Sequence, residues 1–112
     1  MSVSVRVKAM RPVKCPHCGE IVCYKNLDEE WTRGKEWMEL LEDIGYYTPY
    51  DDSKSHAENF PYYADDMILT DKQVKTLLRF LKKDKAHDHD TVWSVVNYAI
   101  KNNYKVVINA DW

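Results

Sequence analysis

Residues 2–24, SVSVRVKAMRPVKCPHCGEIVCY, decide how the chain folds. Residues 2–10 alternate between polar and apolar side chains, which is the pattern of a half-buried strand. Pro12 then ends this strand or confines it to a sheet edge, because proline has no amide hydrogen to donate. Strand-like composition returns after Gly19, and the segment CPHCG between the two strands favours a hairpin turn. We therefore expect two strands within residues 3–24, joined at the cysteine segment.

The apolar spacing changes to that of a helix from about Leu27, and Gly45 ends this helix. Gly34 would lie inside the helix, where glycine costs about 1 kcal/mol relative to alanine. The predicted apolar face consists of Trp31, Trp37, Met38, Leu40, Leu41 and Ile44. Residues 46–66 show no period and are expected to form a long loop, a kind of segment that is often functional.

The clearest local signal is a helix over residues 69–83. Thr70 and Gln73 predict a capping box, in which each side chain binds the other residue's backbone amide. Leu69 and Val74 stand where a hydrophobic staple is expected.

A further helix and a strand are expected to complete the chain. Asp88 or Asp90 suits the N-cap of this helix, and the pair 102–103, both asparagine, suits its left-handed C-cap. Residues 104–112 have the β-branched composition of a strand. The sequence therefore predicts a single α+β domain over residues 1–112. In it, a small antiparallel sheet, made of the N-terminal hairpin plus the C-terminal strand, packs against about three helices.

The composition of the chain argues against several classes of function. The 112 residues include 16 basic and 18 acidic side chains, a net charge of −2, which argues against a nucleic-acid partner. Glycine-rich phosphate loops do not occur in the sequence, and no apolar run approaches the ~18 residues of a membrane helix. Three cysteines without a secretory signal indicate a reducing, cytoplasmic compartment.

The cysteines are the candidate metal ligands. Cys15, Cys18 and Gly19 match one half of a zinc knuckle, because the turn aims both sulfurs inward and glycine accepts the unusual backbone angle. A closed tetrahedral site needs two more ligands, and Cys23 would be carried away from the turn by the strand. The other donors are His17, His56, His87 and His89. Zinc is therefore possible, but no cofactor is the expectation.

Two other interpretations of the cysteines stay open. In the first, Cys15 and Cys18 form a redox dithiol, which would require a helix N-terminus at Cys15 to lower its pKa. In the second, which we favour, the segment is only a hairpin turn and Cys23 is a small apolar core residue.

The loop over residues 46–66 is the candidate partner-binding surface. Exposed tyrosine is a low-entropy anchor for a protein partner, although the rings could instead cover the sheet. The candidate residues are Tyr46, Tyr47, Tyr50, Asp51, Asp52, Phe60, Tyr62 and Tyr63.

The remaining polar clusters favour structural roles. His87 and His89 are expected at a solvated helix cap rather than on a metal, and the pairs Glu29–Glu30 and Glu39–Glu42 on the polar side of the first helix. No catalytic constellation can be assembled, so we do not expect an enzyme.

The segments CPHCGEIV, LLEDIG, LTDKQVKTLLRFLKK and YKVVINADW together resemble small uncharacterised proteins of bacteriophages and prophages. This resemblance implies action in the cytoplasm of a bacterial host cell and no known activity. The resulting hypothesis is a non-enzymatic accessory protein that binds a bacterial host or defence protein through the tyrosine-rich loop. The alternatives are a zinc-knuckle module that contacts nucleic acid or a macromolecular complex, a dithiol oxidoreductase and a small-ligand binder. The oligomeric state stays open.

Overall fold

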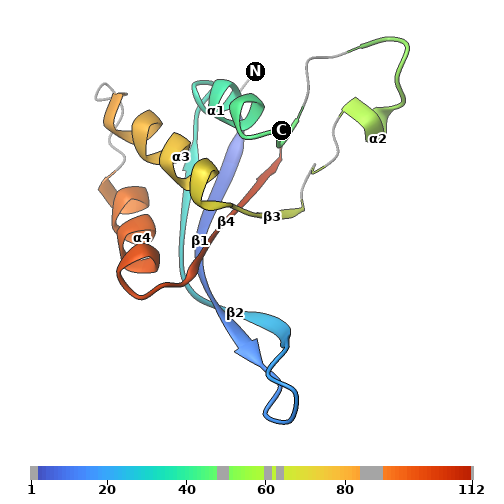
Figure 1. Cartoon of the computed structure of the whole chain (residues 1–112). Coiled ribbons are helices and arrows are strands. Elements are labelled where there is room, and N and C mark those ends of the chain that lie inside the picture. Colours follow the sequence, from blue (N-terminus) through green and yellow to red (C-terminus); the bar gives the residue numbers. More distant parts are fainter. Residues whose placement is uncertain (1–2, 48–50, 60–61, 63–64, 84–89, 112) are drawn as a thin grey trace.

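A computed structural model describes residues 3–47, 51–59, 62, 65–83 and 90–111, and Figure 1 shows how their helices and strands are arranged. The elements are β1 Ser4–Lys14, β2 Ile21–Arg33, α1 Trp37–Asp43, α2 His56–Asn59, β3 Asp66–Ile68, α3 Asp71–Lys83, α4 Asp90–Lys101 and β4 Lys105–Asp111. The fold class is α+β, as the sequence predicted.

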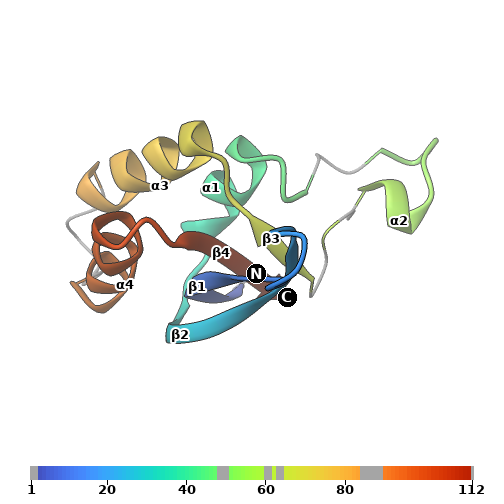
Figure 2. The same ribbon diagram turned by 60° about the horizontal axis from the view of Figure 1, so that its bottom comes forward.

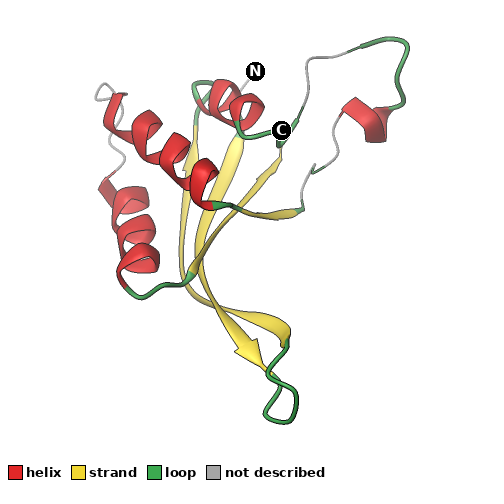
Figure 3. Cartoon of the chain, in the orientation of Figure 1, coloured by secondary structure: helices red, strands yellow, loops and turns green. Residues whose placement is uncertain are grey.

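The strands form one antiparallel sheet in the order β2-β1-β4-β3 (Figure 3). The N-terminal hairpin and the C-terminal strand therefore pair as expected, with β1 between β2 and β4. The sequence did not predict β3, which has only three residues and is too short to show a period.

One face of the sheet is covered by α1, α3 and α4, while α2 lies apart from this layer (Figure 2). The alternation in β1 places Val3, Val5, Val7 and Ala9 against the helices, where all four are fully buried. Trp37 at the start of α1 joins the same core and packs edge-on against Phe80 of α3, with ring centroids 4.8 Å apart. Burying each of the larger apolar side chains contributes about 1.5–3 kcal/mol, so burial of this face stabilises the sheet.

The first helix is shorter than the sequence predicted. It begins at Trp37, whereas β2 continues to Arg33, so Gly34 lies between the two elements and not inside a helix. Residues 28–33 pair with β1, and this long-range pairing outweighs the helical spacing of the apolar residues. Trp31 therefore belongs to a strand, and the pair Glu29–Glu30 does too.

The ends of the helices follow the predicted signals. Gly45 has φ +82° and ends α1, and Asn103 has φ +57° after α4. At the start of α3, the Thr70 amide donates to Gln73 Oε1 at 2.8 Å and the Gln73 amide donates to Thr70 Oγ1 at 3.3 Å. Gln73 Nε2 also donates to the carbonyl of Ile44 at 2.8 Å, which ties the start of α3 to the end of α1.

Candidate binding surfaces

The described helices α1, α3 and α4 lie on one side of the sheet, and we call the opposite sheet face the open face (Figure 2). Strand register places on it every second residue of β1 and the partners of those residues. Its members are Ser4, Arg6, Lys8, Met10, Asn26, Glu29, Trp31, Arg33, Asp66, Ile68, Lys105, Val107, Asn109 and Asp111.

A polar network crosses the open face from β2 to β3. Lys8 Nζ lies 3.1 Å from Asp66 Oδ1 and 3.8 Å from Glu29 Oε1, and Asn109 Nδ2 donates to Asp66 Oδ1 at 2.9 Å. Partial burial alone would raise the pKa of Asp66, but the hydrogen bonds from Asn109 and Lys8 and the charge of Lys8 lower it overall. The network links side chains of all four strands and fixes the polar centre of this face.

Apolar side chains flank the polar network. Trp31 of β2 is 55% exposed and Ile68 of β3 is 41% exposed, so the open face carries an apolar residue near each edge. Val107 lies between its cross-strand partners Lys8 and Ile68 and is fully buried, although no helix covers it. Sequence reasoning missed this surface, because Trp31 was assigned to a helix and Ile68 precedes the capping box of α3.

Residues 11–26 form a two-stranded arm that extends beyond the helices (Figure 1). β4 pairs with β1 only from Ser4 to Met10, so at Pro12 the strand has β2 as its neighbour on one side alone. Pro12 thus lies at a sheet edge, the second of the two outcomes predicted for it.

The tip of the arm is a tight turn that contains two of the cysteines. The Cys15 amide donates to the carbonyl of Glu20 at 2.8 Å, and the Gly19 amide donates to the carbonyl of Cys15 at 2.9 Å. Gly19 has φ +74°, the positive angle for which glycine was expected. The chain thus remains extended on both sides of the turn, as predicted.

The turn also changes the acidity of Cys15. The backbone amides of Cys18 and then His17, and the thiol of Cys18, donate to its sulfur and lower its pKa, whereas burial opposes this effect weakly. A helix N-terminus, which a redox dithiol would use for the same purpose, does not follow Cys15, because the chain enters β2.

The third cysteine is not a core residue, and this expectation was wrong. Cys23 lies in β2 opposite Val13 and is exposed, because the arm extends beyond the helices that cover the rest of the sheet. Among the residues that the structure describes, no group of three or more histidine, cysteine, aspartate or glutamate side chains is placed to hold a metal ion.

The first tyrosine of the candidate partner-binding loop is part of the core. Tyr46 is 0% exposed, and the Ala110 amide donates to its hydroxyl oxygen at 2.8 Å. The hydroxyl lies 2.7 Å from the carbonyl oxygen of Asp65 and 3.1 Å from that of Ala110, either of which can accept its proton. Burial raises the pKa of Tyr46 to about 12. Tyr46 therefore fastens the segment before β3 to the end of β4 and presents no surface to a partner.

Other parts of the loop are also organised internally. Asn59 is fully buried: its Oδ1 accepts from the Asp51 amide at 2.9 Å, and its Nδ2 lies 3.1 Å from the carbonyl oxygens of Asp51 and Ser55. Asp51 Oδ1 in turn accepts from the amide and hydroxyl of Ser53 at 2.9 and 2.8 Å, which lowers the Asp51 pKa. The long loop thus contains a compact turn around one asparagine.

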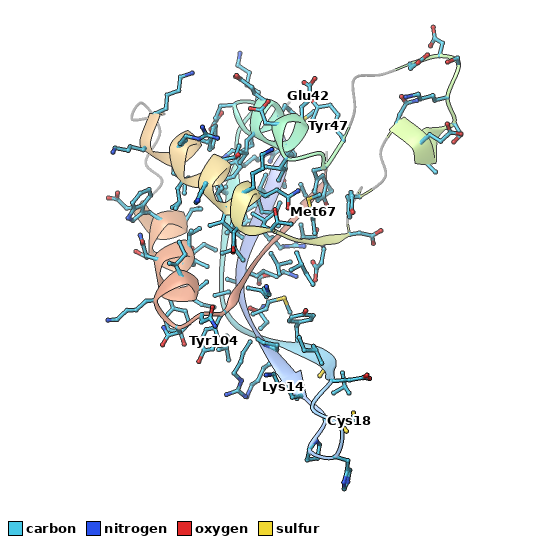
Figure 4. The ribbon with its side chains drawn as sticks, in the orientation of Figure 1. Lys14, Cys18, Glu42, Tyr47, Met67 and Tyr104 are labelled. Carbon is cyan, nitrogen blue, oxygen red and sulfur yellow. The ribbon has the colours of Figure 1, made fainter. Side chains whose placement is uncertain are left out.

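The rest of the loop candidates differ in exposure. Tyr47 is half-buried beside Glu42 (Figure 4), and its pKa is raised by burial and by that carboxylate. Tyr62 is 36% exposed, and Asp51 and Asp52 are exposed. Tyr50, Phe60 and Tyr63 lie outside the described residues, as do His87 and His89.

A groove of about 380 Å³ lies between α1 and α3. Its α1 wall carries acidic side chains and its α3 wall carries basic ones, with Phe80 between them. The charged lining residues are Glu36, Glu39, Asp43, Arg79 and Lys83. Tyrosine does not line this groove, so the small-ligand alternative based on tyrosine rings has no support from it.

Comparisons with protein-family models, curated proteins and solved structures found no match to this chain. Among the helices of the described ranges, none has the length and apolar character needed to cross a bilayer.

Proposed function

We propose that this chain is a non-enzymatic binding protein that holds another protein on its open face. The observation that carries the proposal is Trp31, a tryptophan 55% exposed on a strand, beside a polar network that is already ordered. Tryptophan is enriched among the residues that dominate interface energies, because it buries a large area at little cost in side-chain entropy.

The charges of the open face favour a protein over a nucleic acid. Four cationic residues share the face with three carboxylates, so no continuous basic track is present for a phosphate backbone. The cations are Arg6, Lys8, Arg33 and Lys105, and the carboxylates are Glu29, Asp66 and Asp111. A mixed surface of this kind suits a polar protein rim around an aromatic anchor.

The resemblance to phage and prophage proteins directs the proposal to a bacterial host or defence protein. We retain a second contact with the partner in this proposal, made by the exposed side chains of Tyr62, Asp51 and Asp52. Tyr46 is removed from the proposed contact residues, because it is fully buried in the core.

The test compares two tryptophans of similar exposure. Trp31→Ala removes the proposed anchor, and Trp93→Ala removes a tryptophan that is 39% exposed on α4, away from the open face. The full-length chain and both variants are immobilised, exposed to bacterial lysate, and the affinity for the captured protein is measured by titration. We expect at least a ~10-fold loss with Trp31→Ala and less than a ~2-fold change with Trp93→Ala. The reverse pattern, or equal binding by all three proteins, would contradict the proposal.

A further inference from the structure

The arm tip is built as one half of a metal site. Its turn is closed by two backbone hydrogen bonds, from the Cys15 amide to Glu20 and from the Gly19 amide to Cys15, and by the positive φ of Gly19. Cys15 and Cys18 therefore lie on one short, fixed loop. Two thiolates held in this way are two of the four ligands of a tetrahedral zinc site.

The position of the tip determines where the other ligands come from. Cys18 lies at the far end of the arm from the helices (Figure 4), and Cys23 lies farther back in β2, opposite Val13. A second molecule can approach the tip from the solvent side, and an identical tip would supply two more thiolates. Two-fold symmetry, the commonest symmetry of homo-oligomers, would bring two identical arm tips together.

We infer that the arm tips of two copies of this chain share one zinc ion, each copy contributing Cys15 and Cys18. Zn²⁺ binds four sulfurs, and each of the four thiols releases its proton to solvent, so the zinc–tetrathiolate unit carries two negative charges. No electron is transferred.

The charge of the arm complements that unit. Within residues 11–26 the charged side chains are three cations and one carboxylate, in a chain whose overall charge is −2. The cations are Arg11, Lys14 and Lys25, and the carboxylate is Glu20. Two apposed arms would repel each other on their own, and the anionic zinc centre between them offsets this repulsion. Dimer formation is therefore coupled to the metal.

The experiment uses the full-length chain with a non-thiol reductant, first stripped of metal and then titrated with ZnCl₂. Native mass spectrometry and sedimentation velocity measure the bound zinc and the oligomeric state. We expect a monomer without zinc and a dimer that contains one zinc per two chains. The double variant Cys15→Ser/Cys18→Ser is expected to stay monomeric and to lose at least ~100-fold in zinc affinity.

Two matched variants separate this site from other donors. Cys23→Ser keeps the tip intact, and His87→Ala/His89→Ala removes the histidine pair; both are expected to dimerise like the natural chain. A monomer that binds one zinc, loss of binding in either control variant, a dimer that forms without zinc, or no zinc binding at all would each overturn the inference. Circular dichroism of all variants verifies folding, which the arm substitutions should preserve because the arm lies outside the core.

The zinc result is independent of the proposed partner-binding function. Trp31→Ala leaves both tip cysteines in place, and the cysteine double variant leaves the open face in place. We therefore expect Trp31→Ala to lose partner binding and keep zinc-dependent dimerisation, and the cysteine double variant to do the reverse.

Discussion

Two segments, the arm over residues 11–26 and the tyrosine-rich segment over residues 46–66, differ from what their sequences suggest about which one is scaffold and which one is available for binding. The sequence of the cysteine segment predicts a turn with a structural role only, yet Cys18 at its tip is exposed and lies far from the helices. The tyrosine segment reads as a recognition loop, yet Tyr46 is fully buried and Asn59 is too. The difference teaches that distance from the core, more than residue type, decides which side chains are available for binding.

The largest effect that would test this comparison is expected from Tyr46→Ala. Removing the buried ring leaves a cavity in the hydrophobic core and should lower the free energy of unfolding by about 3–5 kcal/mol. Urea denaturation followed by circular dichroism measures it. Tyr62→Ala is the control: its ring is 36% exposed with its centroid 5.7 Å from that of Tyr46, and we expect a loss of about 1 kcal/mol or less. Similar losses for the two variants would contradict a core role for Tyr46.

The Tyr46 hydroxyl makes stability depend on alkaline pH. The pKa is about 12 in the folded chain and about 10 when the residue is exposed by unfolding, so the unfolded state loses its proton first. The corresponding stability is fully present below about pH 10 and is lost as the pH rises towards 12, an effect of about 2–3 kcal/mol.

Tyr46→Phe should remove this pH dependence. It should also cost about 1–3 kcal/mol at neutral pH, because the buried Ala110 amide loses its acceptor. Urea unfolding at pH values from 8 to about 11 compares the two proteins. An equally steep alkaline loss in the phenylalanine variant would show that another group titrates.

Asn59→Ala tests whether the tyrosine segment is organised from within. The substitution leaves the Asp51 amide without its acceptor and removes the side-chain bonds to the carbonyls of Asp51 and Ser55, at an expected cost of about 1–2 kcal/mol. Proteolysis under native conditions should then cut within residues 51–59 faster than in the natural chain. Unchanged cleavage would indicate that this turn does not depend on the asparagine.

A smaller effect is expected on the open face. The folded pKa of Asp66 is below its ordinary value, so its contribution is present above about pH 4 and is lost as the pH falls through the folded pKa. Asp66→Asn should cost about 0.5 kcal/mol at pH 7 and flatten the acid side of the stability profile. Asp111→Asn on the same face serves as the control and should cost less than Asp66→Asn at pH 7.

The arm should give the smallest effects on stability. Val22→Ser and Cys23→Ser alter exposed side chains of β2, so each should change the free energy of unfolding by less than about 0.5 kcal/mol. Losses above about 1.5 kcal/mol would show that the arm belongs to the core, and the contrast with Tyr46 would disappear.

Local signals in the sequence predicted much of the fold. The alternation in β1, the capping box of Thr70 and Gln73, and the left-handed Asn103 each depend on neighbours within a few residues, and each is present in the structure. The pairing of the C-terminal strand with the N-terminal hairpin was also predicted, but the long-range contacts of individual residues could not be predicted in this way. Trp31 has helical spacing but lies in a strand because residues 28–33 pair with β1.

The same limit explains the candidate sites. The burial of Tyr46 depends on Ala110, which is 64 positions away in sequence, and the Lys8–Asp66 pair spans 58 positions. The turn at Cys15 and Cys18 was predicted, because its bonds are local. The exposure of Cys23 was not, since it depends on how far the helices extend over the sheet.

Residue-resolved hydrogen exchange of the metal-free native chain tests most directly that Tyr46 belongs to the scaffold and that the arm is free surface. The amide of Ala110, bound to the Tyr46 hydroxyl, should exchange only through global unfolding. The amides of the arm, such as that of Cys23, should exchange at least ~100-fold faster through local opening. An Ala110 amide that exchanges as fast as the arm, or an arm protected to the global limit, would contradict the account.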